Sequence, residues 1–141
     1  MGVAARIDEI VAAHALREGP LLPILHDVQA EFGCVDEEAE AAIARALNLS
    51  RAEVHGVVSF YHDFTAQPDH RPCVELCRAE ACQARGVEAL VAAAESTAGE
   101  RVRIKTVYCL GLCSVGPAAR LGVRLHARLD QAGLVRLIEN A

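Results

Sequence analysis

Two cysteine pairs in the second half of the chain constrain its fold and chemistry more than any other feature. Cys77 and Cys82 are separated by four residues, and Cys109 and Cys113 by three. The first pair begins at the end of a predicted strand at 73–77, and the second begins just after a predicted strand at 102–107. Since the carboxyl ends of parallel strands meet at one edge of a sheet, we expect four thiolates to converge there from two loops.

The spacing within each cysteine pair indicates which kind of metal centre the thiolates bind. Structural zinc favours C-x2-C knuckles and a thioredoxin-type dithiol requires C-x-x-C, and neither spacing occurs here. A [2Fe–2S] cluster takes four thiolates, two per iron, and suits looser spacings. No His lies between residues 71 and 125, which disfavours a Rieske centre with two His ligands. The pattern favours an iron–sulfur cluster, with a zinc-stabilised interaction module and redox thiols as the alternatives.

The residues around the pairs fit a cluster loop. Gly111, Ser114 and Gly116 allow a tight fold that turns backbone N–H groups toward sulfur. The remaining cysteines, Cys34 and Cys73, are expected to be small buried hydrophobes rather than ligands.

Composition excludes several classes of protein. The chain has 141 residues, a net charge of −5 and no basic surface signature, so nucleic-acid binding is not expected. No apolar run approaches the ~18 residues of a membrane helix, and Arg6, Asp8 and Glu9 interrupt the first apolar segment. These features predict a cytoplasmic protein that does not bind membranes. In such a compartment thiols rarely form structural disulfides, which again favours a metal or redox site.

The order of predicted elements indicates an α+β fold with two domains. An N-terminal helical bundle is predicted for residues 1–70 and a thioredoxin-like α/β domain for 71–141. The bundle's helices are predicted at 4–18, 21–32, from Asp36 onward, and after a capping box at Ser50–Glu53. A linker follows at 65–72. The second domain is predicted to contain a strand at 73–77, helix at 79–98 interrupted at Gly86, a strand at 102–107, a hairpin at 118–127 and a helix at 130–140.

Nothing in the sequence indicates a catalytic site of its own. No G-x-G-x-x-G fingerprint follows a strand, and Gly111–Gly116 is followed by Pro117 rather than by the Lys of a phosphate loop. His55 and His62 lie two turns apart on one helix and, with Tyr61, are expected to pack or to form hydrogen bonds rather than to catalyse. The sequence therefore predicts an electron carrier without a substrate pocket.

Several segments together resemble the thioredoxin-like [2Fe–2S] ferredoxin family, the small iron–sulfur subunits of complex I-type NADH dehydrogenases. The resemblance is carried by Leu21–His26, Ser50–Tyr61, the Cys77-x4-Cys82 pair and Val107–Cys113. It implies one [2Fe–2S] cluster with Cys77, Cys82, Cys109 and Cys113 as ligands. It also implies docking beside a larger flavoprotein subunit that carries FMN and the NADH site. The family commonly has an aromatic residue after Gly33, where this chain has Cys34.

Within the family, the run Cys77–Gln83 is most similar to the gamma subunit of the cytosolic, molybdenum-containing, NAD-dependent formate dehydrogenase. This likeness implies a non-catalytic electron-transfer subunit of that oxidoreductase. A larger molybdenum and iron–sulfur catalytic subunit would then be a second partner. The equivalent subunit of a complex I-type NADH:quinone oxidoreductase or of an NAD-linked hydrogenase is the alternative.

Overall fold

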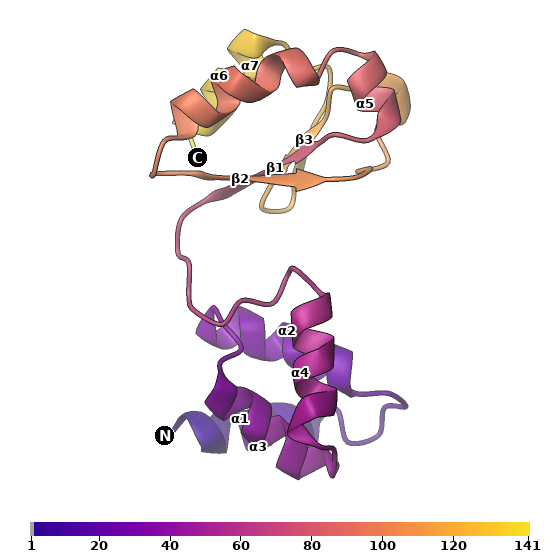
Figure 1. Ribbon diagram of the computed structural model, residues 1–141, viewed down its shortest axis with the longest axis vertical. Helices are drawn as coiled ribbons and strands as arrows, with labels where there is room; N and C mark the ends of the chain where they lie inside the picture. Colours follow the sequence, from indigo (N-terminus) through magenta and orange to yellow (C-terminus); the bar gives the residue numbers. More distant parts are fainter. Residues whose placement is uncertain (1) are drawn as a thin grey trace. The chain divides into compact units, whose positions relative to one another are not determined.

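A computed structural model describes residues 2–141 and divides the chain into two compact units (Figure 1). The first unit ends at His70 and the second is Arg71–Ala141. The first is entirely helical and the second combines helices with a sheet, so the fold class is α+β, as predicted. Across the described residues, no helix has both the length and the apolar character needed to cross a bilayer.

The first unit consists of four helices around one apolar core. Apolar residues at helical spacing supply this core: Ile7, Leu25, Val28, Ile43 and Val54 are all inaccessible to solvent. The helices are α1 (Val3–Ala13), α2 (Leu21–Phe32), α3 (Glu37–Leu47) and α4 (Arg51–Phe60).

Local capping explains where these helices begin and end. Asp36 accepts a hydrogen bond from the Ala39 N–H at 2.8 Å, and Ser50 and Glu53 form the predicted capping box. Gly33 ends α2 in the left-handed conformation, with φ 74°. The predicted extent of the first helix was wrong at its C-terminal end. Residues 14–16 form a turn and residues 17–18 a bend instead, and the ring of His14, the α1 C-cap, lies 2.6 Å from the Asp27 carboxylate.

A four-stranded mixed sheet forms the centre of the second unit. Its strand order is β2-β1-β3-β4, with β1 and β2 parallel and the other neighbours antiparallel. The strands are β1 (Cys73–Cys77), β2 (Arg103–Val107), β3 (Ala119–Leu121) and β4 (Arg124–His126). The helices are α5 (Glu80–Ala84), α6 (Glu88–Ala98) and α7 (Gln131–Glu139), with a short 3-10 helix, η1 (Cys113–Val115).

Helices α6 and α7 lie on the same face of this sheet (Figure 1). The alternation along β1 directs Val74 and Leu76 into the core beneath them, where Leu134 and Ile138 of α7 are also buried. Glu75 lies on the opposite face of β1 and forms ion pairs with Lys105 and Arg120 of the two neighbouring strands. This core holds the strand ends from which both cysteine loops leave.

Candidate metal centre

The parallel pairing of β1 and β2 brings the two cysteine pairs to one edge of the sheet. Cys77, the last residue of β1, is in register with Val107, the last residue of β2, and Cys109 follows two residues later. The backbone N–H of Cys109 donates a hydrogen bond to the Cys77 Sγ at 3.3 Å. The predicted convergence of the two loops is therefore present, and it follows from the strand register.

Cys109 and Cys113 face each other across one turn of chain. Their Sγ atoms are 3.5 Å apart, in hydrogen-bond contact. Two thiolates on one tetrahedral iron with bonds of ~2.3 Å would lie about 3.7 Å apart, so this separation fits a shared iron. Both side chains are exposed. Cys109 has a positive φ of 87°, and the N–H of Gly111 donates to its sulfur at 3.4 Å.

Cys77 and Cys82 form the buried pair, since each is only 2% exposed. Burial raises the pKa of the Cys77 thiol, but hydrogen bonds to its sulfur outweigh that effect and leave the pKa below its ordinary value. The donors are the backbone N–H groups of Ala79, Cys109 and Leu110 and the Cys82 thiol. The lowered pKa favours the thiolate form of Cys77, which is the form that binds metal.

Two other thiols of the set favour their protonated form. Burial, and then the hydrogen bond to Cys77, raise the pKa of Cys82, although the backbone N–H of Ala118 acts in the opposite direction. The hydrogen bond to Cys109 raises the pKa of Cys113, and the charges of Cys109 and Cys77 add to it. The charges of Cys77 and Cys113 also raise the Cys82 pKa, so the two pairs are close enough to interact electrostatically. A cation among them would favour all the thiolates together.

Within residues 2–141, no three His, Cys, Asp or Glu side chains converge as ligands of a single ion. A binuclear cluster does not require such a group, because each of its irons takes two thiolates. The donor set here consists of two sulfur pairs on facing loops, with N–H groups directed at the sulfurs. Such a set fits a [2Fe–2S] cluster.

Gly116 lies unusually close to the buried pair. A Cβ added there would be 2.9 Å from the Cys82 Sγ and 3.7 Å from the Cys82 Cα, and a sulfur contact of 2.9 Å is too short to persist. The backbone of Gly116 is ordinary, with φ −68°. The glycine is therefore required for space beside Cys82 and not for its conformational freedom.

We expect Gly116→Val to reduce the cluster content of the purified protein about tenfold, because branched atoms at this position would displace the Cys82 sulfur. Iron and acid-labile sulfide per chain are the measurement. Gly56→Val is the control, since a Cβ at Gly56 meets nothing within 4 Å and the residue has ordinary helical backbone within α4. Full cluster content in Gly116→Val would show that the loop can move away from Cys82 without loss of the site.

The structure places the other candidate residues outside this centre. Cys34 lies in the first unit, and Cys73 lies at the opposite end of β1 from Cys77. Both are partly buried. His55 is largely exposed, and its Nδ1 lies 3.1 Å from the carboxylate of Glu40, which is buried.

Sequence reasoning missed part of the site. Ala79, Leu110 and Ala118 contribute through backbone N–H groups, which carry no side-chain signal. Arg85 was also overlooked, although its side chain approaches Gly116. Arg78, which follows Cys77 in the sequence, donates two hydrogen bonds to the Glu88 carboxylate at 2.8 and 2.6 Å.

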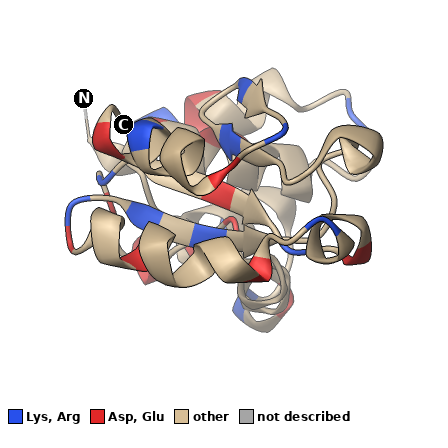
Figure 2. Ribbon diagram, turned by 90° about the horizontal axis from the view of Figure 1, so that it is seen from above, with Lys and Arg blue, Asp and Glu red and all other residues tan. Residues whose placement is uncertain are grey.

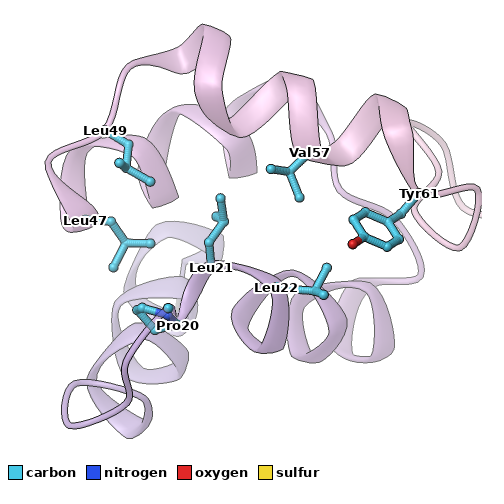
Figure 3. A pocket seen from close by; sticks show the side chains of 8 residues that line it. Pro20, Leu21, Leu22, Leu47, Leu49, Val57 and Tyr61 are labelled. Carbon is cyan, nitrogen blue, oxygen red and sulfur yellow. The ribbon is translucent and has the colours of Figure 1, made fainter.

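An apolar pocket of about 450 Å³ lies in the first unit, between the start of α2 and one side of α4 (Figure 3). Among its lining side chains, Tyr61 provides the polar atom. Figure 3 shows Val57 of α4 and Tyr61, the residue that follows α4, opposite Leu21 and Leu22 of α2. The weakly acidic phenol of Tyr61 is the only titratable side-chain group in this lining. This pocket lacks the groups for catalysis.

Comparisons with known proteins agree with the geometry. The NADP-reducing hydrogenase subunit HndA of Solidesulfovibrio fructosivorans is 28% identical over 131 residues, covering 86% of this chain and 77% of that protein. An NADH-quinone oxidoreductase subunit of Rhizobium meliloti is 30% identical over 149 residues, covering 99% and 89%. The corresponding NADH-quinone oxidoreductase subunit of Escherichia coli K12 is 30% identical over 121 residues, covering 79% and 73%.

Solved structures show the same likeness. A chain of an NAD⁺-reducing [NiFe]-hydrogenase in the H₂-reduced state superposes with a TM-score of 0.72 and 28% identity. The match covers 86% of this chain but only 22% of the hydrogenase chain, so this protein corresponds to a small part of that longer one. The sequence profile of the thioredoxin-like [2Fe–2S] ferredoxin family matches residues 7–141, nearly the whole length. The chain therefore belongs to the thioredoxin-like [2Fe–2S] ferredoxin family.

Proposed function

We propose that this chain is an electron-transfer subunit that holds one [2Fe–2S] cluster through Cys77, Cys82, Cys109 and Cys113. The observation that carries the proposal is the meeting of the two cysteine loops at one sheet edge, where the Cys109 N–H donates to the Cys77 sulfur. When bound, the cluster accepts and passes on single electrons. A zinc-stabilised module is disfavoured by the family and by the two-pair donor set.

The chain's own residues would divide this work between them. Cys77 and Cys82 hold one side of the site away from water, and backbone N–H groups stabilise the Cys77 thiolate. Cys109 and Cys113 are exposed and form the side that a redox partner can approach. Because electron transfer requires proximity and not a substrate pocket, an exposed edge on a rigid sheet is a suitable arrangement.

The partner that best suits such an edge is a flavoprotein subunit that binds FMN and NADH. Support comes from relatives whose names describe NADH-quinone oxidoreductase and NADP-reducing hydrogenase subunits. We further propose that the parent enzyme is a cytoplasmic NAD-dependent formate dehydrogenase, in which a larger molybdenum and iron–sulfur subunit oxidises formate. The run Cys77–Gln83 supports this choice. Two alternatives for the parent enzyme remain open to the same test. The likeness to two hydrogenases supports an NAD-linked hydrogenase, and the likeness to the Rhizobium meliloti subunit supports an NADH:quinone oxidoreductase.

Isolation of the intact assembly from its native host tests the proposal. A tagged copy of the chain should copurify with an FMN-containing subunit and a molybdenum-containing subunit, and the assembly should reduce NAD⁺ with formate. Copurification with a nickel-containing subunit would identify the parent enzyme as a hydrogenase instead. Copurification with a membrane-bound quinone-reducing arm would identify it as an NADH:quinone oxidoreductase. A colourless protein that contains zinc and no iron would overturn the cluster itself.

A further inference from the structure

Arg85 lies beside the buried half of the proposed cluster site. The point where a Cβ of Gly116 would stand is 2.9 Å from the Cys82 Sγ and 3.4 Å from the Cδ of Arg85. The outer part of the Arg85 stem and the Cys82 sulfur therefore meet at the same small space next to Gly116. Arg85 as a whole is exposed, so its guanidinium extends from this contact toward solvent.

The local backbone fixes Arg85 in this position. It is the C-cap of α5, and its N–H lies 3.2 Å from the carbonyl oxygens of both Ala81 and Cys82. The N–H of Val87 also donates to the Cys82 carbonyl, at 3.0 Å. Since residues three apart on a helix share a face, Arg85 stands on the same side of α5 as Cys82.

A positive charge at this position has an electrostatic consequence. A cluster with four thiolates carries a net charge of about −2 when oxidised and about −3 when reduced, so nearby cations favour the reduced form. Arg78, the cation next to Cys77, is matched by its two bonds to Glu88. The second unit carries ten basic and seven acidic residues, against four and twelve in the first, and Figure 2 marks both kinds along the ribbon.

We propose that Arg85 is a positioning residue that covers the Cys82 side of the cluster with its stem and raises the reduction potential with its charge. This inference rests on the proposed function, because it requires a cluster held by Cys82. The one-electron step it concerns is reduction of the oxidised cluster by an external donor, which in the test is dithionite acting through redox mediators.

The test is a mediated redox titration of the purified whole chain, followed by the EPR signal of the reduced protein. Arg85→Met keeps an apolar cover but removes the charge, whereas Arg85→Lys keeps the charge. We expect Arg85→Met to lower the midpoint, so that the ratio of reduced to oxidised protein at a fixed ambient potential falls roughly two- to fivefold. Arg85→Lys should retain most of the wild-type ratio, and added salt should shrink the difference between the two variants.

Arg136→Met is the matched control, since it removes one exposed positive charge near the C-terminal end of α7. Arg101, which precedes β2, donates to the Ile138 carbonyl at this end of α7, whereas the cysteine loops leave the other end of the sheet. The control should leave the midpoint unchanged. An Arg85→Met midpoint equal to that of wild type, or an equal shift in Arg136→Met, would overturn the inference about Arg85 alone. A wild-type chain without iron and sulfide would overturn the proposed function, and this inference with it.

Discussion

Replacing Cys77, Cys82, Cys109 or Cys113 singly by Ser is expected to abolish the EPR signal of the reduced protein or to alter it markedly. Each of these residues belongs to a sulfur pair at the shared sheet edge, so each loss leaves one iron with a single thiolate. Cluster content should fall about tenfold or more, since even the loss of an outer hydrogen-bonding partner has effects of that order. A cluster that survives with a serine oxygen should show shifted signals, because the ligand change alters one iron.

Cys34→Ser and Cys73→Ser are the matched controls. Cys34 lies in the first unit, and Cys73 is four residues before Cys77 on an extended strand, roughly 13 Å along the chain. Both variants should keep the wild-type signal in shape and intensity. Loss of the signal in a folded Cys73→Ser protein, or a wild-type spectrum from any of the other four variants, would refute the ligand assignment.

The place where the loops converge could be predicted from the sequence because it depends on strand ends. The sequence predicts a short strand before each cysteine pair, and parallel strands bring their carboxyl ends to one edge. The observed register, with Cys77 opposite Val107, satisfies that expectation. Most helix boundaries were predictable for the same kind of local reason, since the Asp36 cap and the Ser50–Glu53 capping box are formed by neighbouring residues.

The finer features of the site depend on contacts between residues far apart in sequence. The closeness of Gly116 to Cys82 arises only when η1 packs beside α5, and no local pattern encodes it. The same holds for the N–H of Ala118, which acts on the Cys82 sulfur across the site. At the other end of the chain, the turn at His14 replaces the last part of a predicted helix, and its ring contacts Asp27 of the next helix. Side-chain periodicity does not report such contacts.

The two units carry different features, which suggests that they do different work. We propose that residues 1–70 and 71–141 are separate domains, each with its own apolar core. The second contains all four proposed ligands, the sheet and the N–H donors. The first contains none of these and instead has the apolar pocket of Figure 3 and the exposed side chains of Leu16 and Phe60. We expect this unit to serve mainly as the docking surface for the partner, since an apolar groove is a common feature of interaction sites.

Deleting residues 1–65 should therefore leave a fragment that binds the cluster but no longer assembles with the flavoprotein subunit. The fragment keeps the core around Val74, Leu76 and Ile138. A domain of about 75 residues has only a small free energy of unfolding, so the fragment is expected to be less stable than the whole chain. Visible absorption and iron content report the cluster, and copurification from the native host reports assembly. Full-length Cys109→Ser is the complementary control, since it should assemble without a normal cluster. Assembly of the fragment as complete as that of the whole chain would show that docking depends on the second unit, and a fragment that cannot fold would refute the division into separate domains.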